Sequence, residues 1–461
     1  MDFECFKAYD IRGVVGESIT EEVCYQIGRA TATVLVAKSM VIGHDARESS
    51  PQLAMAFKEG LVDQGCDVVD IKLAGTEEVY FATSFFGVDA GAVITASHNP
   101  IDYNGIKFVG SGSRPLDVEK EFLAIKKIAK KSDSLEKAKV RGSYEAKSLH
   151  SKEAFAAKVL SFVDAENLRP MRVVLNCGNG AAGPAVKEIK SQLSNAGSKV
   201  SIIEMFQEPD ASFPNGIPNP ILEENHKVTS DRVLAESADF GVAFDGDFDR
   251  CFFFDNQGSF VPGEIIIGLL ATYFAGQGED LKIVHEPRLV LNTRSVCQNH
   301  GITGVQTQTG HLFMKKAMRE SEAIYGGEIS AHHYFRDFYY CDSGMIPWIL
   351  VCDLLSSGSE NLADLVSSQR KQFPSSGEIN FRVGDAAKVI SSIETEYMRT
   401  ATEIDRMDGL SISFPGWRFN LRASNTEPLL RLNLETIGNP ELLKLKTDEL
   451  ASRIKDIDQP S

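Results

Sequence analysis

Residues 40–71 read MVIGHDARESSPQLAMAFKEGLVDQGCDVVDI and contain the pattern that decides the fold. A β-branched run is followed by a turn, a helical stretch that closes on Gly65, and a second β-branched run. Glycine is common just after a helix because it adopts the left-handed conformation easily. The segment therefore predicts a strand–helix–strand unit with parallel strands.

Two later segments repeat this plan. They are MRVVLNCGNGAAGPAVKEIKSQLSNAGSKVSII at 171–203 and LKIVHEPRLVLNTRSVCQNHGITGVQT at 281–307, and their helices close on Gly197 and Gly301. Units this far apart predict three related α/β domains with mixed, mostly parallel sheets rather than a solenoid. The remaining C-terminal residues predict a smaller α+β domain. We place the four domains at residues 1–150, 151–256, 257–370 and 371–461.

The composition is that of a globular protein, with 43% hydrophobic and 24% charged residues among 461. The formal net charge is -16. Such an acidic excess argues against binding to nucleic acid or to an anionic membrane. An anionic small molecule remains possible as substrate if a local basic pocket receives it.

The N-terminal sequence and the cysteines indicate where in the cell the protein is expected. The N-terminal stretch MDFECFKAYDIRG lacks the apolar segment of a signal peptide, and Pro347 interrupts the longest apolar stretch. The eight cysteines are scattered without a CxxC pair, which predicts buried thiols in a reducing compartment. We therefore expect a cytoplasmic protein, either a monomer or a homodimer.

The first stretch with chemical potential is GAVITASHNPIDYNGIKF, residues 91–108. Ser97 and His98 follow the carboxyl end of a predicted strand, where ligands bind in open α/β sheets. Ser97 could be a covalent nucleophile. No GxSxG motif surrounds it, however, and serine, asparagine and proline also make an ordinary turn. The local pattern leaves both interpretations open.

The second stretch is FGVAFDGDFDRCFFFD, residues 240–255. Asp245, Asp247 and Asp249 alternate, so in an extended chain their carboxylates converge and need a cation. Hard oxygen ligands of this kind suit Mg²⁺. An EF-hand is excluded because Arg250 and Asn256 stand where that motif has Gly and Glu. A plain turn is disfavoured because apolar flanks make uncompensated charge costly.

The third stretch, NCGNGAAG, matches G-x-G-x-x-G with glycines at 178, 180 and 183. Glu204 follows about 20 residues later, as in a dinucleotide-binding unit. This pattern supports a rival hypothesis, an NAD-dependent enzyme. Pro184 directly after the last glycine argues against it, and a tight strand–helix turn explains the same glycines.

Two more polar stretches follow. IYGGEISAHHYF (324–335) offers donors and acceptors that suit sugar hydroxyls, without the spacing of a zinc site. LRASNTEPLLR (421–431) forms a basic, hydroxyl-rich island in an acidic chain, and arginines with backbone N–H groups bind phosphate well. The candidate residues are Glu328, Ser330, His332 and His333 in the first stretch, and Arg422, Ser424, Asn425, Thr426 and Arg431 in the second.

Taken together, these stretches resemble the α-D-phosphohexomutase family, most of all its bacterial phosphomannomutase branch. TASHNP resembles the phosphoserine loop of the family, DGDFDR its magnesium loop, GEISAHH its sugar-binding loop and RASNTEP its phosphate-binding loop. KAYDIRG, GHDAR, PDASFPNGIPNP, HEPRL and YFRDFYYCDSGMIPW fit as well. Ile329 departs from the methionine usual in that branch, a conservative change.

The resemblance implies a four-domain, heart-shaped protein with one loop per domain around a central cleft. It also implies a phosphomannomutase that interconverts mannose 6-phosphate and mannose 1-phosphate through a phosphoserine and a bisphosphorylated hexose, which also serves as primer. Such an enzyme would feed GDP-mannose synthesis. A dual-specificity phosphoglucomutase/phosphomannomutase is the first alternative.

The resemblance further assigns roles to residues. Ser97 would carry the phosphoryl group, and Mg²⁺ would be held by Asp245, Asp247, Asp249 and a phosphoserine oxygen. Lys107 is expected as the acid/base, with His98 second, and a lysine in that role needs a lowered pKa. The remaining expected contacts to the transferring phosphate or the substrate are Arg12, Arg250, Tyr9, His311, Glu328, Ser330, His332 and the residues of the phosphate-binding stretch. A carbohydrate-phosphate binding module without catalysis is a further alternative, which magnesium-dependent turnover would exclude.

Overall fold

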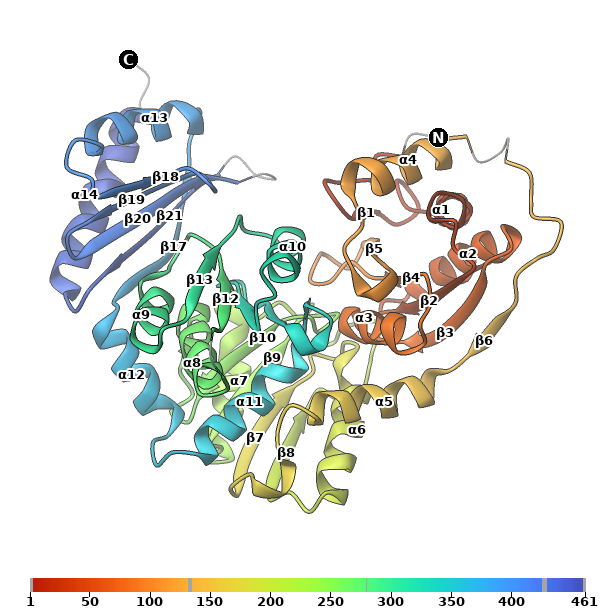
Figure 1. The fold of residues 1–461 in the computed structure, drawn as a ribbon, viewed down its shortest axis with the longest axis horizontal. Coiled ribbons are helices and arrows are strands. Elements are labelled where there is room, and N and C mark those ends of the chain that lie inside the picture. The colour runs from red at the N-terminus through yellow and green to blue at the C-terminus, as the bar shows by residue number, and fades with distance from the viewer. Residues whose placement is uncertain (1–2, 132–134, 279, 425–428, 459–461) are drawn as a thin grey trace. The chain divides into compact units, whose positions relative to one another are not determined.

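The computed structural model describes residues 3–131, 135–278, 280–424 and 429–458 (Figure 1). All three predicted strand–helix–strand units are confirmed. In each, the two strands pair in parallel: β2 (Ser39–His44) with β3 (Asp67–Leu73), β7 (Met171–Asn176) with β8 (Val200–Met205), and β12 (Lys282–His285) with β13 (Thr303–Gln306). The intervening helices are α2 (Ser50–Asp63), α6 (Ala182–Asn195) and α9 (Leu291–His300).

The first sheet has the strand order β1-β5-β4-β2-β3-β6. Its other strands are β1 (Ile11–Val14), β4 (Ala90–Ile94), β5 (Tyr103–Gly110) and β6 (Tyr144–Ala146). The pairs β2–β4 and β3–β6 are parallel, whereas β5 runs antiparallel to both of its neighbours. The sheet is therefore mixed and mostly parallel, as predicted.

Helices cover both faces of this sheet. They are α1 (Glu21–Leu35), α3 (Thr76–Phe85), α4 (Leu123–Ala129) and α5 (Ser148–Leu160), besides α2. Because side chains alternate along a strand, Met40 and Ile42 enter one apolar cluster with α1 and α2, while Val41 enters another with α3. Burial on both faces explains why β2 is apolar along most of its length.

The second sheet contains the strand order β10-β9-β7-β8. β9 (Phe240–Phe244) and β10 (Cys251–Asp255) form an antiparallel hairpin beside the parallel pair β7–β8. α7 (His226–Ala235) packs on β7 and β9. β11 (Phe260–Val261) follows β10 along the chain.

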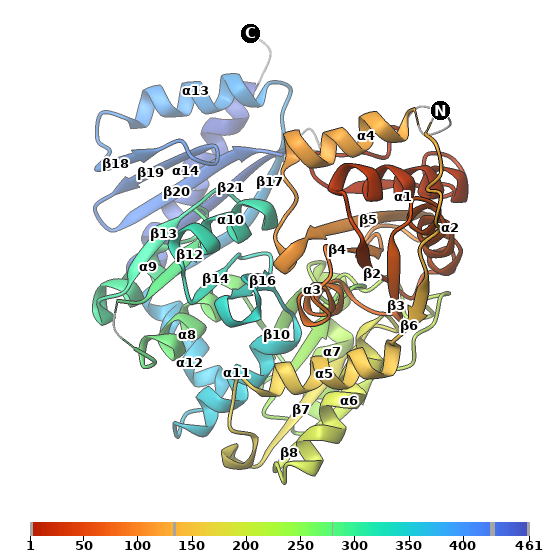
Figure 2. The same cartoon turned by 45° about the vertical axis from the view of Figure 1, so that its right-hand side comes forward.

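The C-terminal segment forms the expected α+β domain. Its sheet is antiparallel with the order β17-β21-β20-β19-β18, and α13 and α14 pack against it (Figures 1 and 2). The bounds are β17 (Ser375–Arg382), α13 (Ala386–Tyr397), β18 (Glu403–Asp405), β19 (Leu410–Phe414), β20 (Trp417–Ala423), β21 (Leu429–Thr436) and α14 (Pro440–Asp458). Val389, Ile393, Leu450 and Ile454 bring the helices into one core with the strands.

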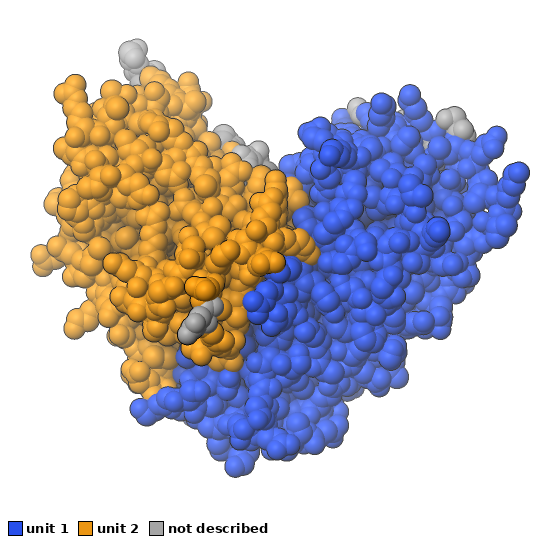
Figure 3. Space-filling view, viewed as in Figure 1, with its two compact units in different colours: residues 1–260, 332–359 blue, residues 261–331, 360–461 orange. Residues whose placement is uncertain are grey.

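The chain divides into two compact units (Figure 3). Unit 1 comprises residues 1–260 and 332–359, and unit 2 comprises residues 261–331 and 360–461. Segment 332–359 holds β15 (His333–Phe335), β16 (Cys341–Asp342) and α11 (Met345–Ser356). The buried carboxylate of Glu77, on α3, fixes this segment to unit 1 by accepting hydrogen bonds from the backbone N–H groups of Gly344 (3.1 Å) and Met345 (3.0 Å).

Unit 2 also contains α8 (Gly263–Ala275), α10 (His311–Ser321), β14 (Tyr325–Gly327) and α12 (Leu362–Gln372). Arg418, which forms a buried ion pair within the C-terminal sheet, also ties this sheet to the segment before α9. Arg418 Nη1 lies 2.8 Å from Glu435 Oε1, and the guanidinium also donates to the carbonyl oxygens of Pro287 and Arg288. Among the described residues no helix is both long and apolar enough to cross a bilayer.

Candidate functional site

Ser97 lies in the turn between β4 and β5 and is only 2% exposed. Its backbone is left-handed, with φ 51°, and its N–H donates to Thr95 Oγ1 at 2.8 Å. The hydroxyl lies 2.9 Å from Asp245 Oδ2 and 3.0 Å from His98 Nδ1. A strained residue held by its surroundings at a strand end is typical of a functional position.

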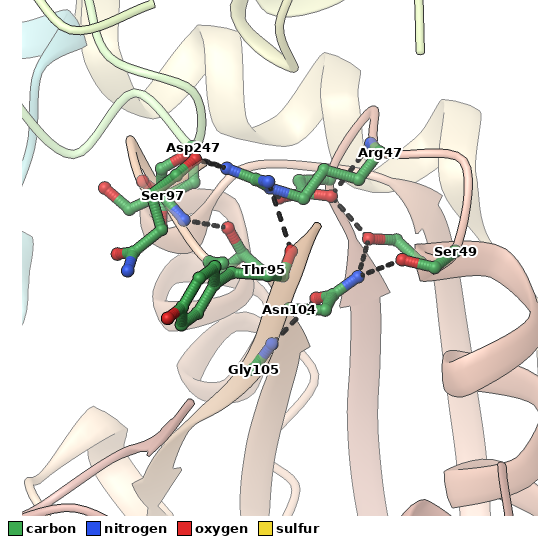
Figure 4. A network of polar contacts seen from close by, with 12 residues as sticks. Arg47, Ser49, Thr95, Ser97, Asn104, Gly105 and Asp247 are labelled. Carbon is green, nitrogen blue, oxygen red and sulfur yellow. Dashed lines mark hydrogen bonds and ion pairs between the residues drawn. The ribbon is translucent and has the colours of Figure 1, made fainter. Parts of the chain in front are cut away.

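Arg47 holds this turn in place (Figure 4). Its buried guanidinium donates to four carbonyl oxygens: Nη2 to Ser97 (2.9 Å) and Asn99 (2.6 Å), and Nη1 to Pro100 (2.7 Å) and Tyr103 (3.1 Å). Arg47 Nε lies 3.4 Å from Asp45 Oδ2. The Arg47 side chain thus supplies hydrogen-bond donors to carbonyl groups that, because of the left-handed turn, do not pair with a neighbouring strand.

Asp245, Asp247 and Asp249 lie in the loop between β9 and β10, and all are buried. One ligand atom from each lies within 4.8 Å of the others. Oδ1 of Asp245 and Oδ1 of Asp247 are buried and have no hydrogen-bond partner among the described residues. Such oxygens are costly unless a cation joins them, so the donor set fits a hard divalent metal ion.

The Oδ2 atoms of Asp247 and Asp249 are held by hydrogen bonds from the protein. Asp247 Oδ2 accepts from Thr76 Oγ1 at 2.5 Å and from Lys107 Nζ at 2.7 Å, and Lys107 also reaches Asp249 Oδ2 at 2.7 Å. Gly246 sits so close to the Ser97 turn that a Cβ there would come within 2.5 Å of the Ser97 carbonyl oxygen. Only glycine therefore permits this approach between the two loops.

Charges and burial shift the pKa values in this region. Burial, with the nearby carboxylates of Asp249 and Asp247, raises the pKa of Asp245 to about 7. Burial would also raise the pKa of Asp249, but Lys107, His332 and Arg250 together outweigh it and hold that pKa well below its usual range.

The two candidate proton carriers are affected in opposite ways. Burial would lower the pKa of Lys107, yet Asp247 and Asp249 outweigh burial and raise it, contrary to the lowered value expected for an acid/base. Burial, together with Arg250 and Arg12, holds the pKa of His98 well below its usual value. The His98 ring therefore resists protonation, which weakens it as a base, and the Ser97 hydroxyl donates its hydrogen bond to Asp245 Oδ2.

The expected arginines of unit 1 lie close by. Arg250 Nε is 3.5 Å from Asp245 Oδ2. Arg12 Nε pairs with Asp10 at 2.9 Å, and Arg12 Nη1 donates to Asn99 Oδ1 in the Ser97 turn. Tyr9 precedes this pair in the chain and is half-buried.

His332 was expected among the sugar-binding residues. Its Nε2 lies 3.5 Å from Asp249 Oδ1 and 4.0 Å from Asp342 Oδ2, so within unit 1 it adjoins the metal-binding loop. Its neighbour His333 is fully buried, and burial lowers its pKa to about 3. His333 is therefore a neutral core residue.

Glu328 lies close to the start of α10, the helix that begins at His311 in unit 2. Glu328 Oε1 accepts a hydrogen bond at 2.7 Å from the backbone N–H of Gly310, which precedes His311 at the start of α10. The N–H of Ile329 donates to Glu286 Oε1 at 2.7 Å, and Ser330 is half-buried. Glu328 is 1% exposed.

The predicted phosphate-binding arginines also lie in unit 2. Arg422 on β20 stands directly opposite Arg431 on β21. The N–H of Ser424 donates to the carbonyl oxygen of Leu429 at 2.8 Å. Asn425 and Thr426 lie outside the described residues.

Several contacts were not predicted from the sequence. Thr76, which holds Asp247, and Glu378, which lies between the arginines of unit 2, carried no local signal. Arg47 was noted only as part of GHDAR, and Arg288 only as part of HEPRL. Their partners lie far away in the sequence, so no motif spacing reports them.

The glycines at 178, 180 and 183 all have packing reasons within the protein. A Cβ on Gly183 would overlap the carbonyl oxygen of Gln207, and one on Gly178 would come within 2.5 Å of Pro218. The same turn supports the metal-binding loop, since the N–H of Ala181 donates to the carbonyl oxygen of Gly246 at 3.2 Å. The tight-turn interpretation therefore accounts for this motif without a dinucleotide.

Comparison with known families gives four consecutive matches. Models of phosphoglucomutase/phosphomannomutase alpha/beta/alpha domains I, II and III match residues 4–136, 153–258 and 262–373. The model of the phosphoglucomutase/phosphomannomutase C-terminal domain matches residues 378–452.

Individual proteins agree with these matches. A phosphomannomutase of Salmonella montevideo is 48% identical over 448 residues, covering 97% of this chain and 98% of that protein. A protein of Xanthomonas campestris pv. campestris named "Phosphohexose mutases" is 44% identical and is covered completely, with 99% of this chain matched. The crystal structure of a phosphoglucomutase/phosphomannomutase family protein from Burkholderia thailandensis is 27% identical, with a TM-score of 0.87, and covers 100% of this chain and 99% of its own.

Proposed function

Because the chain belongs to the phosphoglucomutase/phosphomannomutase family and is an isomerase of phosphohexoses, we propose that it acts as a phosphomannomutase. Its substrates would be mannose 6-phosphate and mannose 1-phosphate, with the product available for GDP-mannose synthesis. The choice of mannose is supported by curated relatives that carry the name phosphomannomutase, such as the Salmonella montevideo protein.

One observation carries the proposed mechanism. The Ser97 hydroxyl lies 2.9 Å from Asp245, inside a buried carboxylate cluster whose Oδ1 atoms on Asp245 and Asp247 lack a hydrogen-bond partner among the described residues. A serine placed beside a cation-demanding cluster suits a phosphoryl carrier. We propose that Ser97 is phosphorylated in the active enzyme.

The metal ion would be held by Asp245, Asp247, Asp249 and the phosphorylated side chain of Ser97. We propose Mg²⁺ because all of these ligands are hard oxygen donors. When bound, Mg²⁺ neutralises negative charge on the phosphoryl group during transfer.

In the first half-reaction the free hydroxyl oxygen of the phosphosugar bonds to the phosphorus on Ser97, and the bond from phosphorus to Ser97 Oγ breaks. The hydroxyl proton passes to a base, for which Lys107 and His98 are the candidates. Arg12 and Arg250 stabilise the transferring charge. The product is a bisphosphorylated hexose, which also serves as primer.

In the second half-reaction the sugar has turned, and Ser97 Oγ takes the other phosphoryl group. Arg422, Ser424, Asn425, Thr426 and Arg431 are proposed to hold the phosphate that is not transferred. Glu328, Ser330, His311, His332 and Tyr9 are proposed to contact the substrate. The boundaries 1–150, 151–256, 257–370 and 371–461 remain our proposal for the four domains.

The mechanism predicts that Ser97→Ala lowers kcat by about 10³-fold or more, because no other group can carry the phosphoryl. Mass spectrometry of the peptide containing Ser97, before and after phosphatase treatment, should show loss of one phosphoryl group. Ser191→Ala, an exposed serine on α6, is the matched control and should keep full activity. Active enzyme without phosphate on that peptide would exclude the covalent scheme.

A dual-specificity phosphoglucomutase/phosphomannomutase is the second candidate, supported by the Xanthomonas relative named for phosphohexoses. The two sugars differ only at C2. Comparing kcat/KM for mannose 1-phosphate and glucose 1-phosphate, with Mg²⁺ and a hexose bisphosphate present, separates the two. Similar values would establish dual specificity, and a ratio of about 100-fold or more would establish a phosphomannomutase.

The eight cysteines are buried and form no disulfide, which supports a reducing compartment, and we propose the cytoplasm.

A further inference from the structure

Arg422 and Arg431 form a cross-strand pair of like charges. They face each other in register on β20 and β21, and their side chains are only 12% and 24% exposed. Like charges directly opposite on a sheet destabilise it unless an anion lies between them. Burial, with the nearby charge of Arg288, lowers the pKa of Arg422.

The anion between them is supplied by Glu378 on the neighbouring strand β17. Glu378 Oε1 lies 3.4 Å from Arg431 Nη1, and Oε2 lies 3.7 Å from Arg422 Nη2 and 3.2 Å from Arg288 Nη1. The register of β17 against β21 shifts between Ser375 and Glu378, and Gly377 within the shift is left-handed at φ 64°. Bulges of this kind re-aim a side chain.

The contacts of Glu378 with Arg422 and Arg431 are those of loose ion pairs, whereas its contact with Arg288 is a hydrogen bond. Distances of 3.4 and 3.7 Å exceed those of aligned charge-assisted hydrogen bonds, and the side chain is 25% exposed. The structural pair Arg418–Glu435 in the same sheet differs on both counts, with 2.8 Å between the charged atoms and at most 3% exposure. Glu378 can therefore be displaced from Arg422 and Arg431 at small cost, while it keeps its hydrogen bond to Arg288 Nη1 at 3.2 Å.

Charge counting indicates what would displace it. Arg288 is already neutralised by Glu286, which accepts from both Nε and Nη2. Near Arg422 lie the carboxylates of Glu378 and, more distantly, of Asp408, whose Oδ2 lies 3.9 Å from Arg422 Nη1, and Glu378 also pairs with Arg431. A phosphate monoester carries a charge of about −1.5 to −2 at pH 7 and offers three acceptor oxygens. It can therefore satisfy both arginines better than one carboxylate does.

We propose that Glu378 is an internal anion that occupies the Arg422–Arg431 pair until a phosphate monoester displaces it. This inference rests on the proposed function, because it requires these arginines to receive the substrate's phosphate. The carboxylate keeps the arginines apart and oriented in the absence of substrate. It also weakens phosphate binding, so that the group can leave each time the sugar has to turn.

The test is Glu378→Gln, which removes the charge and keeps the shape. Inorganic phosphate, used as a competitive inhibitor, should bind about tenfold more tightly, because its competitor is gone. KM for mannose 1-phosphate should fall in parallel, and kcat should fall because release is slower. Phosphate inhibition that is unchanged or weaker than in the wild type would overturn the inference, whether or not the melting temperature falls.

Three further variants make the outcome specific. Glu378→Asp keeps the charge on a shorter side chain and should give inhibition close to wild type. Glu403→Gln removes a different carboxylate of unit 2, one paired with Arg294 at 3.0 Å, and should leave phosphate inhibition unchanged. Arg422→Gln tests the proposed function separately: if phosphate inhibition survives in that variant, the arginine pair is not the phosphate site, whatever Glu378 does.

Discussion

At the scale of single residues, the Ser97 turn depends on Arg47 more than on any group within the turn. The four carbonyl oxygens that Arg47 binds span residues 97–103, so one guanidinium fixes the whole connection from β4 to β5. Five donors in a planar fork make this possible, and lysine cannot reproduce it.

Arg47→Lys should therefore reduce kcat about 100-fold with little change in KM, because a displacement of about 1 Å at a nucleophile has that effect. The measurement is single-turnover transfer from the phosphorylated enzyme to a phosphosugar. Arg29→Lys is the matched control, since Arg29 is also buried in unit 1 but binds Gln64 and the carbonyl oxygen of Leu135. Transfer at the wild-type rate in Arg47→Lys, even with lowered stability, would contradict the positioning role.

Part of the residue-level site is predictable from the sequence. Asp245, Asp247 and Asp249 could be identified because alternating carboxylates between apolar strands are costly to bury without a cation. Thr76 could not, because its partner Asp247 lies 171 positions away. Neither could Glu378, whose aim depends on a bulge that leaves no mark in the local pattern.

At the scale of elements, α1 and α2 pack through paired glycines. A Cβ on Gly28 would overlap the carbonyl oxygen of Phe57, and a Cβ on Gly60 would overlap that of Tyr25. The backbones of α1 and α2 are therefore in direct contact. As a result, α2, the helix of the first strand–helix–strand unit, packs very closely against α1. The periodicity predicted the α2 helix but not this contact.

Gly60→Ala should destabilise the protein by about 1–3 kcal/mol, because forced separation of the helices outweighs the better helix propensity of alanine. Urea unfolding measures the change. Gly276→Ala, after α8, has only one atom within 4 Å of the added Cβ and should change stability by less than about 1 kcal/mol. Equal effects at the two positions would contradict the role of close packing at Gly60.

The sequence predicts which segments form the three strand–helix–strand units, but it does not predict which helices and strands pack together. The sequence shows the residues of α11 only as the longest apolar stretch, interrupted by Pro347, and nothing in it reports that the N-terminus of this helix is capped by the carboxylate of Glu77. The residue pattern of a helix indicates that one face is buried, but it does not indicate which other element covers that face.

At the scale of the whole molecule, the cysteines give a simple readout of integrity. All eight lie within the described residues, and there each is buried and without a disulfide. Burial raises the pKa of the Cys5 and Cys297 thiols to about 11, which removes the reactive thiolate at neutral pH.

A chromogenic disulfide reagent should therefore detect no fast-reacting thiol in the native protein and eight reactive thiols in the protein denatured in guanidinium. The denatured sample calibrates the native one. Any thiol that reacts within seconds in the native state would show that the packing around it opens far more often than the structure implies.

The division of the chain also separates two kinds of task. Ser97, the three aspartates, Lys107 and His98 belong to unit 1, whereas the arginine pair, Glu378 and Glu328 belong to unit 2. In the proposed mechanism, substitutions in unit 2 would change which phosphosugar is preferred, while the groups proposed to break and form bonds keep their own supports in unit 1. In evolutionary terms, a lineage can explore new substrates without rebuilding its chemistry.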